Sequence, residues 1–372
     1  MIYFNNNHIN ILTKHVPGPE RLNIELTTSC NIKCIMCRGK NSYVKDNNAG
    51  KFLRVEDFIT VLNGTDLNRL KLVNLAGNAE SLLNPDIVPI LNVCRENNII
   101  VELITNGTLL TPQISKLLLG FCSEIHISFG GSTKQTFESI RQGAEFELVC
   151  ENIRTLSDLK KAANNQYPHI WLNPILMKRS IHELPDIIKL SMDLGCQGVA
   201  CSHLIVSSPE LIEESLYFHK AECNTFLQKA EVLAKEYNIK LIIPRYFTVE
   251  SCCDEGNDGH KEAWKNCRFL WSHAILGVEG IEPCGSYKNM DFDGNIVRNR
   301  FMDIWNNDWY ANMRYMLLTG NPPDICKVCK DPSVKDVNNI GSYFTDEFLP
   351  EAIAYAQTLK TTPLSKDLEM SC

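Results

Sequence analysis

Short apolar runs rich in β-branched residues recur along residues 22–206 of this 372-residue chain. Six of them read NIELTT, LKLVNLAG, IIVELITNG, EIHISF, HIWLNPIL and GVACSHLIV. The stretches between them carry apolar residues at i, i+3 and i+4, the spacing of one helix face, at residues 85–97, 111–119, 146–163 and 181–194. Thr111 followed by Pro112 is a good N-cap and first-turn pair. Strands that alternate with helices in this way predict βα units and a parallel sheet.

The pattern changes after residue 206. Residues 217–237 predict a further helix and IKLIIP predicts one more strand. The segment 245–266 is polar and contains glycine, which is typical of a linker or lid. AILGVEGIEP predicts a hairpin, and the chain after residue 341 predicts one helix and a frayed polar end. Periodicity alone does not separate an open doubly wound sheet from a barrel.

Charge and composition exclude some classes of function. A hydrophobic content of 44% lets the chain bury one large core, or a barrel with a small added domain. The net charge of −7 argues against a broad basic surface for nucleic acid. No secretion signal and no run of about eighteen apolar residues is present, so we expect a soluble, cytoplasmic protein without a membrane partner. The 16 cysteines then favour metal binding and free thiols over disulfides.

Three of these cysteines, Cys30, Cys34 and Cys37, form a C-x3-C-x2-C motif directly after the first strand-like run. Three thiolates leave one iron of a four-iron cluster open to a substrate or cofactor, whereas four complete its coordination. Structural zinc sites favour two C-x2-4-C pairs separated by a longer stretch, and no fourth Cys or His lies near this loop. Buried free cysteines are the other alternative, and a polar loop suits them poorly.

This motif resembles that of the radical S-adenosylmethionine (SAM) superfamily. The resemblance implies an α/β fold, a partial (β/α)6 TIM-type barrel with its active site at the carboxyl ends of the strands. It also implies a [4Fe-4S] cluster chelated by SAM, with Met36 near the adenine. In that family a reductant such as flavodoxin or ferredoxin supplies one electron, and SAM cleavage yields a 5'-deoxyadenosyl radical that abstracts hydrogen from the substrate.

Further segments resemble the family's SAM-binding regions. In NLAGNAESLL, Gly77 and Glu80 match a Gly-Gly-Glu segment, with Ala79 where glycine is usual, and Glu80 is expected at the SAM ammonium. Ser128 and Arg141 resemble residues that contact the SAM ribose and carboxylate, and Arg suits bidentate carboxylate binding. Asn173 either binds the cofactor or caps its own backbone. The turn at 105–107 is expected to face the barrel mouth.

A second cysteine group lies near the C-terminus, with Cys267 and Cys284 on either side of the predicted hairpin and Cys326-x2-Cys329 farther on. Its surroundings resemble the twitch or SPASM auxiliary domains of radical SAM enzymes, in a small hairpin-plus-helix form. The resemblance implies one auxiliary [4Fe-4S] cluster with four protein ligands, whose work is electron transfer. A structural zinc site with four cysteine ligands is the alternative.

These expectations divide the chain into five parts. Residues 1–21 are an N-terminal extension, 22–244 the barrel, 245–266 a linker or lid, 267–340 the auxiliary domain, and 341–372 a C-terminal helix and tail.

Three reactions fit the resemblance. The first is oxidation of a small hydroxylated substrate of sugar or aminocyclitol type, with the auxiliary cluster accepting an electron. Bases or anchors for it are expected at five positions outside the motifs: Asp254, Glu255, His260, His203 and Arg245. The second is epimerisation with a hydrogen atom from Cys252 or Cys253.

The third reaction is modification of a ribosomally made peptide. It is less favoured because the segment before the first strand is below independent domain size. A non-enzymatic electron carrier is the remaining alternative.

Overall fold

The computed structural model describes residues 13–37, 50–248, 263–285, 294–296, 299–327, 329, 343–345 and 347–361. Its main element is one sheet in the order β10-β8-β7-β5-β4-β3-β1-β11-β12, with β9 also paired to β7. The strands that follow the predicted order are β1 (Arg21–Ile24), β3 (Leu72–Leu75), β4 (Ile100–Thr105), β5 (Cys122–Phe129), β7 (His169–Leu176), β8 (Gly198–Ala200), β9 (Ser202–His203) and β10 (Lys240–Ile242).

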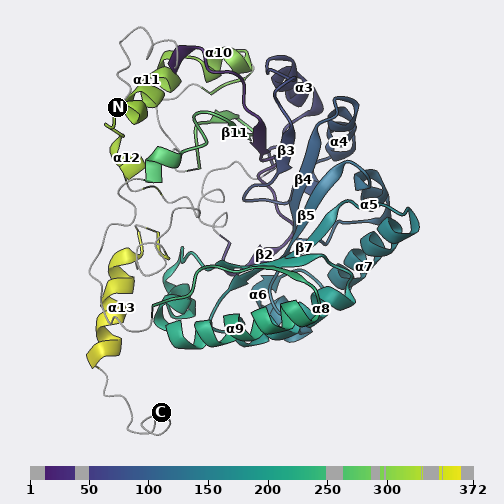
Figure 1. Cartoon of the computed structure of the whole chain (residues 1–372), viewed down its shortest axis with the longest axis vertical. Helices are drawn as coiled ribbons and strands as arrows, with labels where there is room; N and C mark the ends of the chain where they lie inside the picture. Colours follow the sequence, from purple (N-terminus) through teal and green to yellow (C-terminus); the bar gives the residue numbers. More distant parts are fainter. Residues whose placement is uncertain are drawn as a thin grey trace, which may run out of the picture.

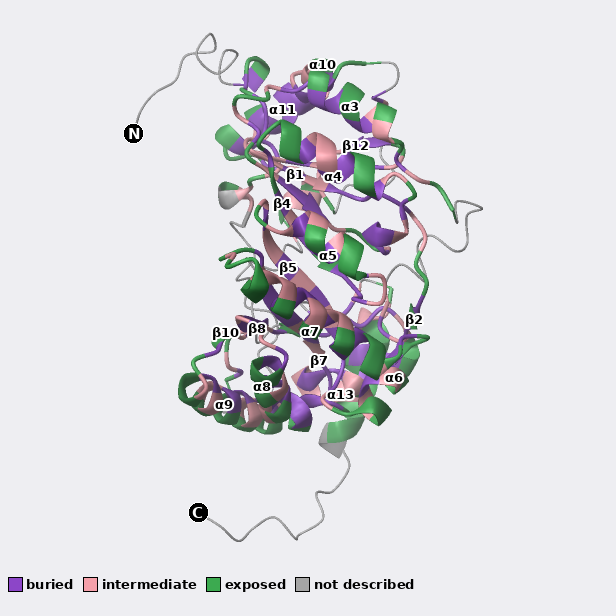
Figure 2. Cartoon of the chain, turned by 90° about the vertical axis from the view of Figure 1, so that its right-hand side faces the viewer, coloured by how far each residue is buried: buried purple, intermediate pink, exposed green. Residues whose placement is uncertain are grey.

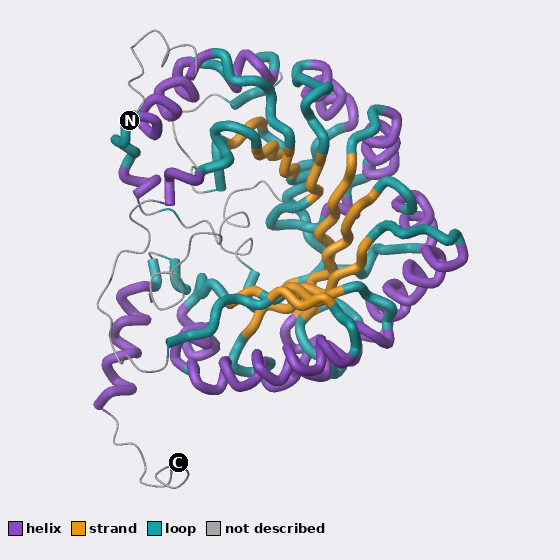
Figure 3. The backbone as a smooth tube through the Cα atoms, in the orientation of Figure 1, coloured by secondary structure: helices purple, strands orange, loops and turns teal. Residues whose placement is uncertain are grey.

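All neighbours from β10 to β1 pair in parallel, as βα units require. Figures 1 and 3 show the strands on the inner side of an open curve and the helices on its outer side. The helices are α3 (Val55–Asn63), α4 (Ile87–Glu96), α5 (Pro112–Leu118), α6 (Lys134–Ile140), α7 (Phe146–Ala162), α8 (Leu184–Asp193) and α9 (Lys220–Glu236). The predicted partial α/β barrel is therefore confirmed.

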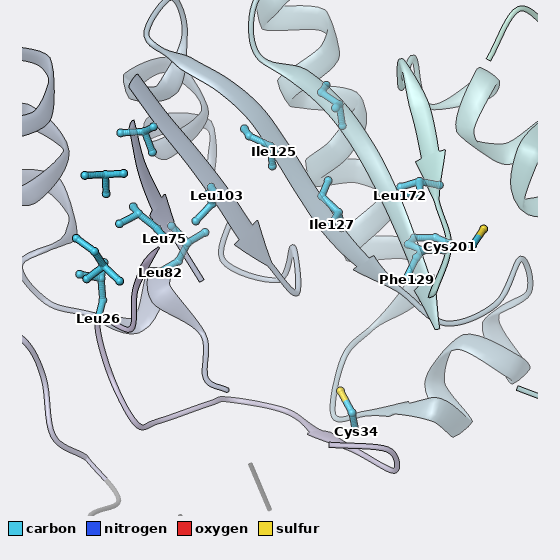
Figure 4. Close-up of a cluster of buried hydrophobic side chains, with 14 of the residues drawn as sticks. Leu26, Cys34, Leu75, Leu82, Leu103, Ile125, Ile127, Phe129, Leu172 and Cys201 are labelled. Atoms are coloured by element: carbon cyan, nitrogen blue, oxygen red, sulfur yellow. The ribbon is translucent and has the colours of Figure 1, made fainter. Parts of the chain in front are cut away.

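Alternation along β5 shows how the sequence gives this layered arrangement. Ile125, Ile127 and Phe129 are 0% exposed and belong to the core between sheet and helices (Figure 4). Glu124, His126 and Ser128 alternate with them and are only half-buried. Successive side chains of a strand point to opposite faces, so these polar residues face the inner side of the curve.

The predicted hairpin is present as β11 (His273–Gly277) and β12 (Gly280–Glu282), which pair in an antiparallel manner. β11 also pairs in parallel with β1, so the hairpin extends the barrel sheet and is not a separate layer. Gly280 has φ +140, and a Cβ there would lie 2.2 Å from the Gly294 carbonyl oxygen, so glycine is required at this turn.

The helices after the hairpin are α10 (Phe301–Trp305), α11 (Asp308–Leu318) and α12 (Asp324–Lys327). α10 packs against the N-terminal segment, where Trp305 Nε1 donates to the Pro17 carbonyl at 3.0 Å, and against the end of α3, where Met302 N donates to the Gly64 carbonyl at 3.1 Å. In Figure 2 buried positions are interspersed with exposed ones around α10 and α11. The final helix is α13 (Leu349–Thr361).

The helix and strand predictions hold, with shifts at the ends. The Thr111 side chain accepts a hydrogen bond from Ile114 N and caps α5, as expected. The predicted helix at 181–194 begins as a short 3-10 turn, Ile181–Glu183, before α8. The sixth predicted strand divides into β8 and β9. A short antiparallel pair, β2 (Lys33–Cys34) with β6 (Arg141–Gln142), was not expected, because two-residue strands carry no periodicity.

Within the described residues, none of the helices combines the length and apolar character that a bilayer span needs.

The shared sheet predicts that the barrel and the hairpin unfold together. Leu276 on β11 is 0% exposed, so Leu276→Ala should cost about 2–5 kcal/mol and lower the midpoint of one common unfolding transition. Val232→Ala on α9, where the side chain is 64% exposed, should change stability by less than about 0.5 kcal/mol. Urea unfolding followed by tryptophan fluorescence and by circular dichroism checks this. Two separate transitions would contradict the shared sheet.

Candidate functional site

The three cysteines of the C-x3-C-x2-C motif lie on the loop after the carboxyl end of β1. Cys34 is on β2 and is buried, and Cys37 is half-buried. Cys30 taken as a whole residue is exposed. Burial of its thiol raises the pKa of Cys30, and so do Glu80, Cys34 and Cys37, which are therefore within electrostatic range. A hydrogen bond from the Ile32 backbone to Cys30 acts in the opposite direction. The loop thus gathers three free thiols at one place.

The donor set suits an iron-sulfur cluster. In the described part of the chain, no three His, Cys, Asp or Glu side chains are grouped to hold a single metal ion. A four-iron cube is wider than one ion, so its ligands need not lie within one ion's coordination distance. The Ile32 backbone is hydrogen-bonded to Cys30, and hydrogen bonds to cysteine sulfurs tune the reduction potential of such clusters.

Glu80 lies directly beside this loop and joins it to the end of β4. Its carboxylate accepts hydrogen bonds from Thr105 Oγ1 at 2.8 Å, Asn106 N at 2.7 Å and Leu82 N at 3.2 Å. Its own backbone N–H donates to the Ser29 carbonyl at 3.0 Å. Burial raises the pKa of Glu80, and the hydrogen bonds oppose that rise. Its expected contact with the SAM ammonium stays a prediction.

Asn106 completes this connection, from the turn predicted to face the barrel mouth. Its Nδ2 donates to Asn31 Oδ1 at 2.9 Å and lies 3.9 Å from Cys30 Sγ. The turn therefore holds the triplet loop as well as closing β4.

Arg141 is brought to the triplet by the unexpected β2–β6 pair. Its Nη1 donates to Cys34 Sγ at 3.4 Å and its Nη2 to the Phe129 carbonyl at 3.2 Å. Its Nε is buried and has no hydrogen-bond partner among the described residues. A buried guanidinium with an unused donor suits an anionic group, and its role at the SAM carboxylate stays a prediction.

The remaining predicted SAM-site residues lie on the same edge of the sheet. Ser128 and Asn173 are register partners on β5 and β7. Met36 is 4% exposed. A Cβ at Gly77 would lie 2.7 Å from the Glu25 side chain, so glycine allows the close approach that Asn78 N needs to donate to Glu25 Oε1 at 2.8 Å. Their contacts with SAM stay predictions.

Sequence reasoning missed a polar network on the inner face of the barrel. His126 Nε2 lies 2.9 Å from Glu124 Oε2, and its Nδ1 lies 3.2 Å from Asn173 Oδ1. The His126 ring stacks on Trp171, with centroids 5.9 Å apart. The signal in the sequence was the alternation of polar and apolar residues in CSEIHISF, read only as a strand.

Two more residues extend this network toward the amino ends of the strands. Arg21 Nη2 pairs with Glu102 Oε2 at 2.7 Å, and Asn23 and Glu102 occupy the same register level as Glu124. The inner face is therefore polar and charged over β1, β4 and β5.

The second cysteine group is also brought together. Burial, with smaller contributions from Cys284 and Cys329, raises the pKa of Cys267 to about 11 and that of Cys326 to about 12. The Phe269 and Leu270 backbones hydrogen-bond to Cys267. Four thiols within electrostatic range suit a four-iron cluster, whereas no three of these described residues are grouped to hold a single ion, and their role as ligands stays a prediction.

The two cysteine groups lie at opposite ends of the strands, one beyond the carboxyl ends and one toward the amino ends. The triplet follows the carboxyl end of β1, which runs parallel to β11. Cys267 precedes β11, and Cys284 follows β12, which runs back in the opposite direction. Cys267 and Cys284 therefore both lie toward the amino ends of the parallel strands. The polar inner face spans the sheet between the two groups.

Four predicted catalytic residues and one further candidate lie outside the described residues, namely Cys252, Cys253, Asp254, Glu255 and His260. Of the other two, Arg245 is exposed. His203 packs its ring near Phe247 and Tyr343, with centroids 4.9 Å and 5.4 Å away.

A pocket of ≈ 410 Å³ opens at the amino ends of β4 and β5, where Arg95, Ile100 and Ser123 contribute to its lining. It lies away from the triplet and contains none of the predicted site residues.

Comparison with known proteins agrees with this geometry. Residues 24–190 match the family model of the radical SAM superfamily. The AdoMet-dependent heme synthase of Methanosarcina barkeri is 25% identical over 348 residues, covering 89% of this chain and 95% of that protein.

Among solved structures, Streptococcus suis SuiB superposes with a TM-score of 0.62 at 14% identity, covering 84% of this chain and 74% of SuiB. Native anSMEcpe with bound AdoMet and the Cp18Cys peptide gives a TM-score of 0.57 at 18% identity, covering 91% and 99%. At these identities the two structures support the fold alone.

The hydrogen bonds of Glu80 predict that its charge stabilises the site. Glu80→Gln should cost about 1.5–3 kcal/mol of unfolding free energy, the range for a hydrogen bond to a charged group, because the amide keeps one acceptor oxygen and puts an N–H donor in place of the other, which leaves a donor of the β4 turn without its acceptor. Glu56→Gln, at an exposed position on α3, should change little. Anaerobic urea unfolding measures both. Equal stability of the Glu80 variant and the wild type would contradict this role.

Proposed function

The chain is a radical SAM enzyme, a member of the radical SAM superfamily, and we propose that it oxidises a small hydroxylated substrate of sugar or aminocyclitol type. Cys30, Cys34 and Cys37 would hold the SAM-binding [4Fe-4S] cluster. Cluster and SAM together supply a 5'-deoxyadenosyl radical when bound. Glu80, Arg141, Ser128 and Asn173 would position SAM, with Met36 and Gly77 shaping its site.

One observation carries this proposal: the two cysteine groups lie at opposite ends of the strands, with a polar inner face between them. A substrate on that face would have the radical source on one side and an electron acceptor on the other. We infer that Cys267, Cys284, Cys326 and Cys329 hold the acceptor, an auxiliary [4Fe-4S] cluster. Oxidation of a carbinol by hydrogen-atom abstraction then needs one electron and one proton removed from the substrate.

The polar inner face supports the substrate class. Arg21 pairs with Glu102 and His126 with Glu124, and each group keeps further donors or acceptors for hydroxyl or amino groups, whereas an apolar substrate would remove water from these charges without replacing it. A sugar or cyclitol satisfies such a face.

His126 is suited to accept the substrate's hydroxyl proton. Nε2 lies against Glu124 Oε2 and Nδ1 against Asn173 Oδ1, and both partners are acceptors, so the nitrogen that carries no proton in the neutral ring already has an acceptor in place for the proton it takes up. Glu124 orients the ring and stabilises the protonated form.

Peptide modification is the second candidate, favoured by the similarity to SuiB and to anSMEcpe with a bound peptide. A short peptide with a serine or cysteine side chain offers the same polar groups to the inner face. An external reductant such as flavodoxin or ferredoxin would serve either reaction. Epimerisation with hydrogen from Cys252 or Cys253 has no support from the described residues.

The division into barrel, linker, auxiliary domain and tail also belongs to this proposal. The barrel and the auxiliary segment would act as one unit, since β11 joins their sheets.

Iron content tests the two-cluster assignment. Anaerobically purified protein should carry about eight irons and eight sulfides, as two [4Fe-4S] clusters require. Cys326→Ala with Cys329→Ala should leave about four irons and preserve 5'-deoxyadenosine formation from SAM. Cys34→Ala with Cys37→Ala should also leave about four but abolish that product. About four irons and one zinc in the wild type would instead indicate a structural zinc site.

His126→Asn tests the inner face. With a panel of inositols and aminocyclitols as probes, we expect substrate oxidation to fall about 10²–10⁴-fold, because the proton acceptor is removed. Formation of 5'-deoxyadenosine without substrate should persist, since the triplet is intact. Glu124→Gln keeps the side-chain shape and should give a smaller loss in the same direction. Unchanged oxidation in both variants would exclude the dyad from proton transfer.

A further inference from the structure

Arg314 on α11 is the most deeply buried cation among the described residues, with 0% exposure. Its Nε donates to the Leu270 carbonyl at 2.7 Å, and its Nη1 donates to the Thr13 carbonyl at 3.0 Å and Asn306 Oδ1 at 3.3 Å. Its Nη2 is buried with no hydrogen-bond partner in the part of the chain that is described. Every acceptor that holds it is neutral.

The guanidinium also has no counter-charge. None of the ion pairs between described residues includes Arg314. Burial lowers the pKa of Arg314 to about 10, which still leaves it protonated at neutral pH. Aromatic rings surround it, with its Cζ 4.9 Å from the Trp305 centroid and 5.1 Å from that of Tyr310. A buried cation that lacks an anion is costly, and cation–π contacts return only part of that cost.

Two residues that contact Arg314 link it to the second cysteine group, and no described thiol is itself among the groups that shift the pKa of Arg314. Tyr310, which contacts Arg314, is within electrostatic range of Cys267 and Cys284. Leu270 provides the second link, since its backbone N–H is bonded to Cys267 and its carbonyl accepts from Arg314. Thiolates gathered around a metal centre would supply the negative charge that the cation lacks.

We propose that Arg314 is a positioning residue for the auxiliary cluster, whose buried positive charge makes that cluster easier to reduce. The inference rests on the proposed function, because it requires a [4Fe-4S] cluster on the four cysteines. Reduction adds one negative charge to the cluster, and a nearby cation in a low-dielectric surrounding stabilises the reduced form more than the oxidised form. The same residue holds the Leu270 carbonyl and so the backbone that donates to Cys267.

Anaerobic redox titration of the reconstituted full chain, followed by electron paramagnetic resonance, tests the charge. In Arg314→Gln the reduction equilibrium constant of the auxiliary cluster should fall at least tenfold, which is about 59 mV toward negative potential for one electron. Arg314→Lys keeps the charge and should shift the potential less. The SAM-binding cluster serves as an internal reference, and Arg179→Gln, an exposed residue paired with Glu214, is the control.

A second variant covers the case in which Arg314→Gln loses the cluster or does not fold. Asn306→Asp leaves Arg314 in place and puts a carboxylate 3.3 Å from its Nη1, so it should shift the auxiliary potential in the same negative direction. Equal shifts in the Gln and Lys variants, or an unmoved potential in Asn306→Asp, would overturn the inference and leave Arg314 a structural residue. Absence of a second cluster from the wild type would instead refute the proposed function, as the iron count shows separately.

Discussion

The parallel pairing of β1 with both β3 and β11 is the constraint on which the site depends. Parallel strands place all their carboxyl ends on one edge, so the triplet loop after β1 meets the ends of β3 and β4. The same pairing anchors the hairpin, and the antiparallel return of β12 carries Cys284 toward the other edge. One set of backbone hydrogen bonds therefore separates the two cysteine groups and leaves the inner face between them.

Three of the charged side chains buried in the described part of the chain lie there without an oppositely charged partner. Glu80, Arg141 and Arg314 are all almost inaccessible, and each is held by backbone groups or neutral side chains instead of an opposite charge. Desolvation makes such charges costly to bury, and the hydrogen bonds that hold them offset that cost, so removing a hydrogen-bond partner is destabilising. Each is linked by contacts to one of the cysteine groups, and the proposed clusters and SAM would supply the charges that these side chains meet.

The inner face of the sheet carries further polar and charged residues, and these are the ones proposed to meet the substrate. Helices cover only the outer side of this sheet, so the alternate residues of each strand that face the inner side can be polar. β5 uses this freedom for Glu124 and His126, and β4 uses it for Glu102. The fold thus builds a polar chamber wall from residues whose neighbours along the chain form the core.

The sequence alone determined the order of strands and helices, since each element carries its own period, and it predicted the hairpin at 274–283. It also marked the triplet and the quartet, because cysteine spacing is a local property. The tertiary structure decided the contacts between segments far apart in the sequence. These are β11 beside β1, Arg141 beside Cys34, and Arg314 against the Leu270 carbonyl. The His126 network depends on register between β5 and β7. No local pattern encodes such contacts, because they follow from packing between segments far apart in the chain.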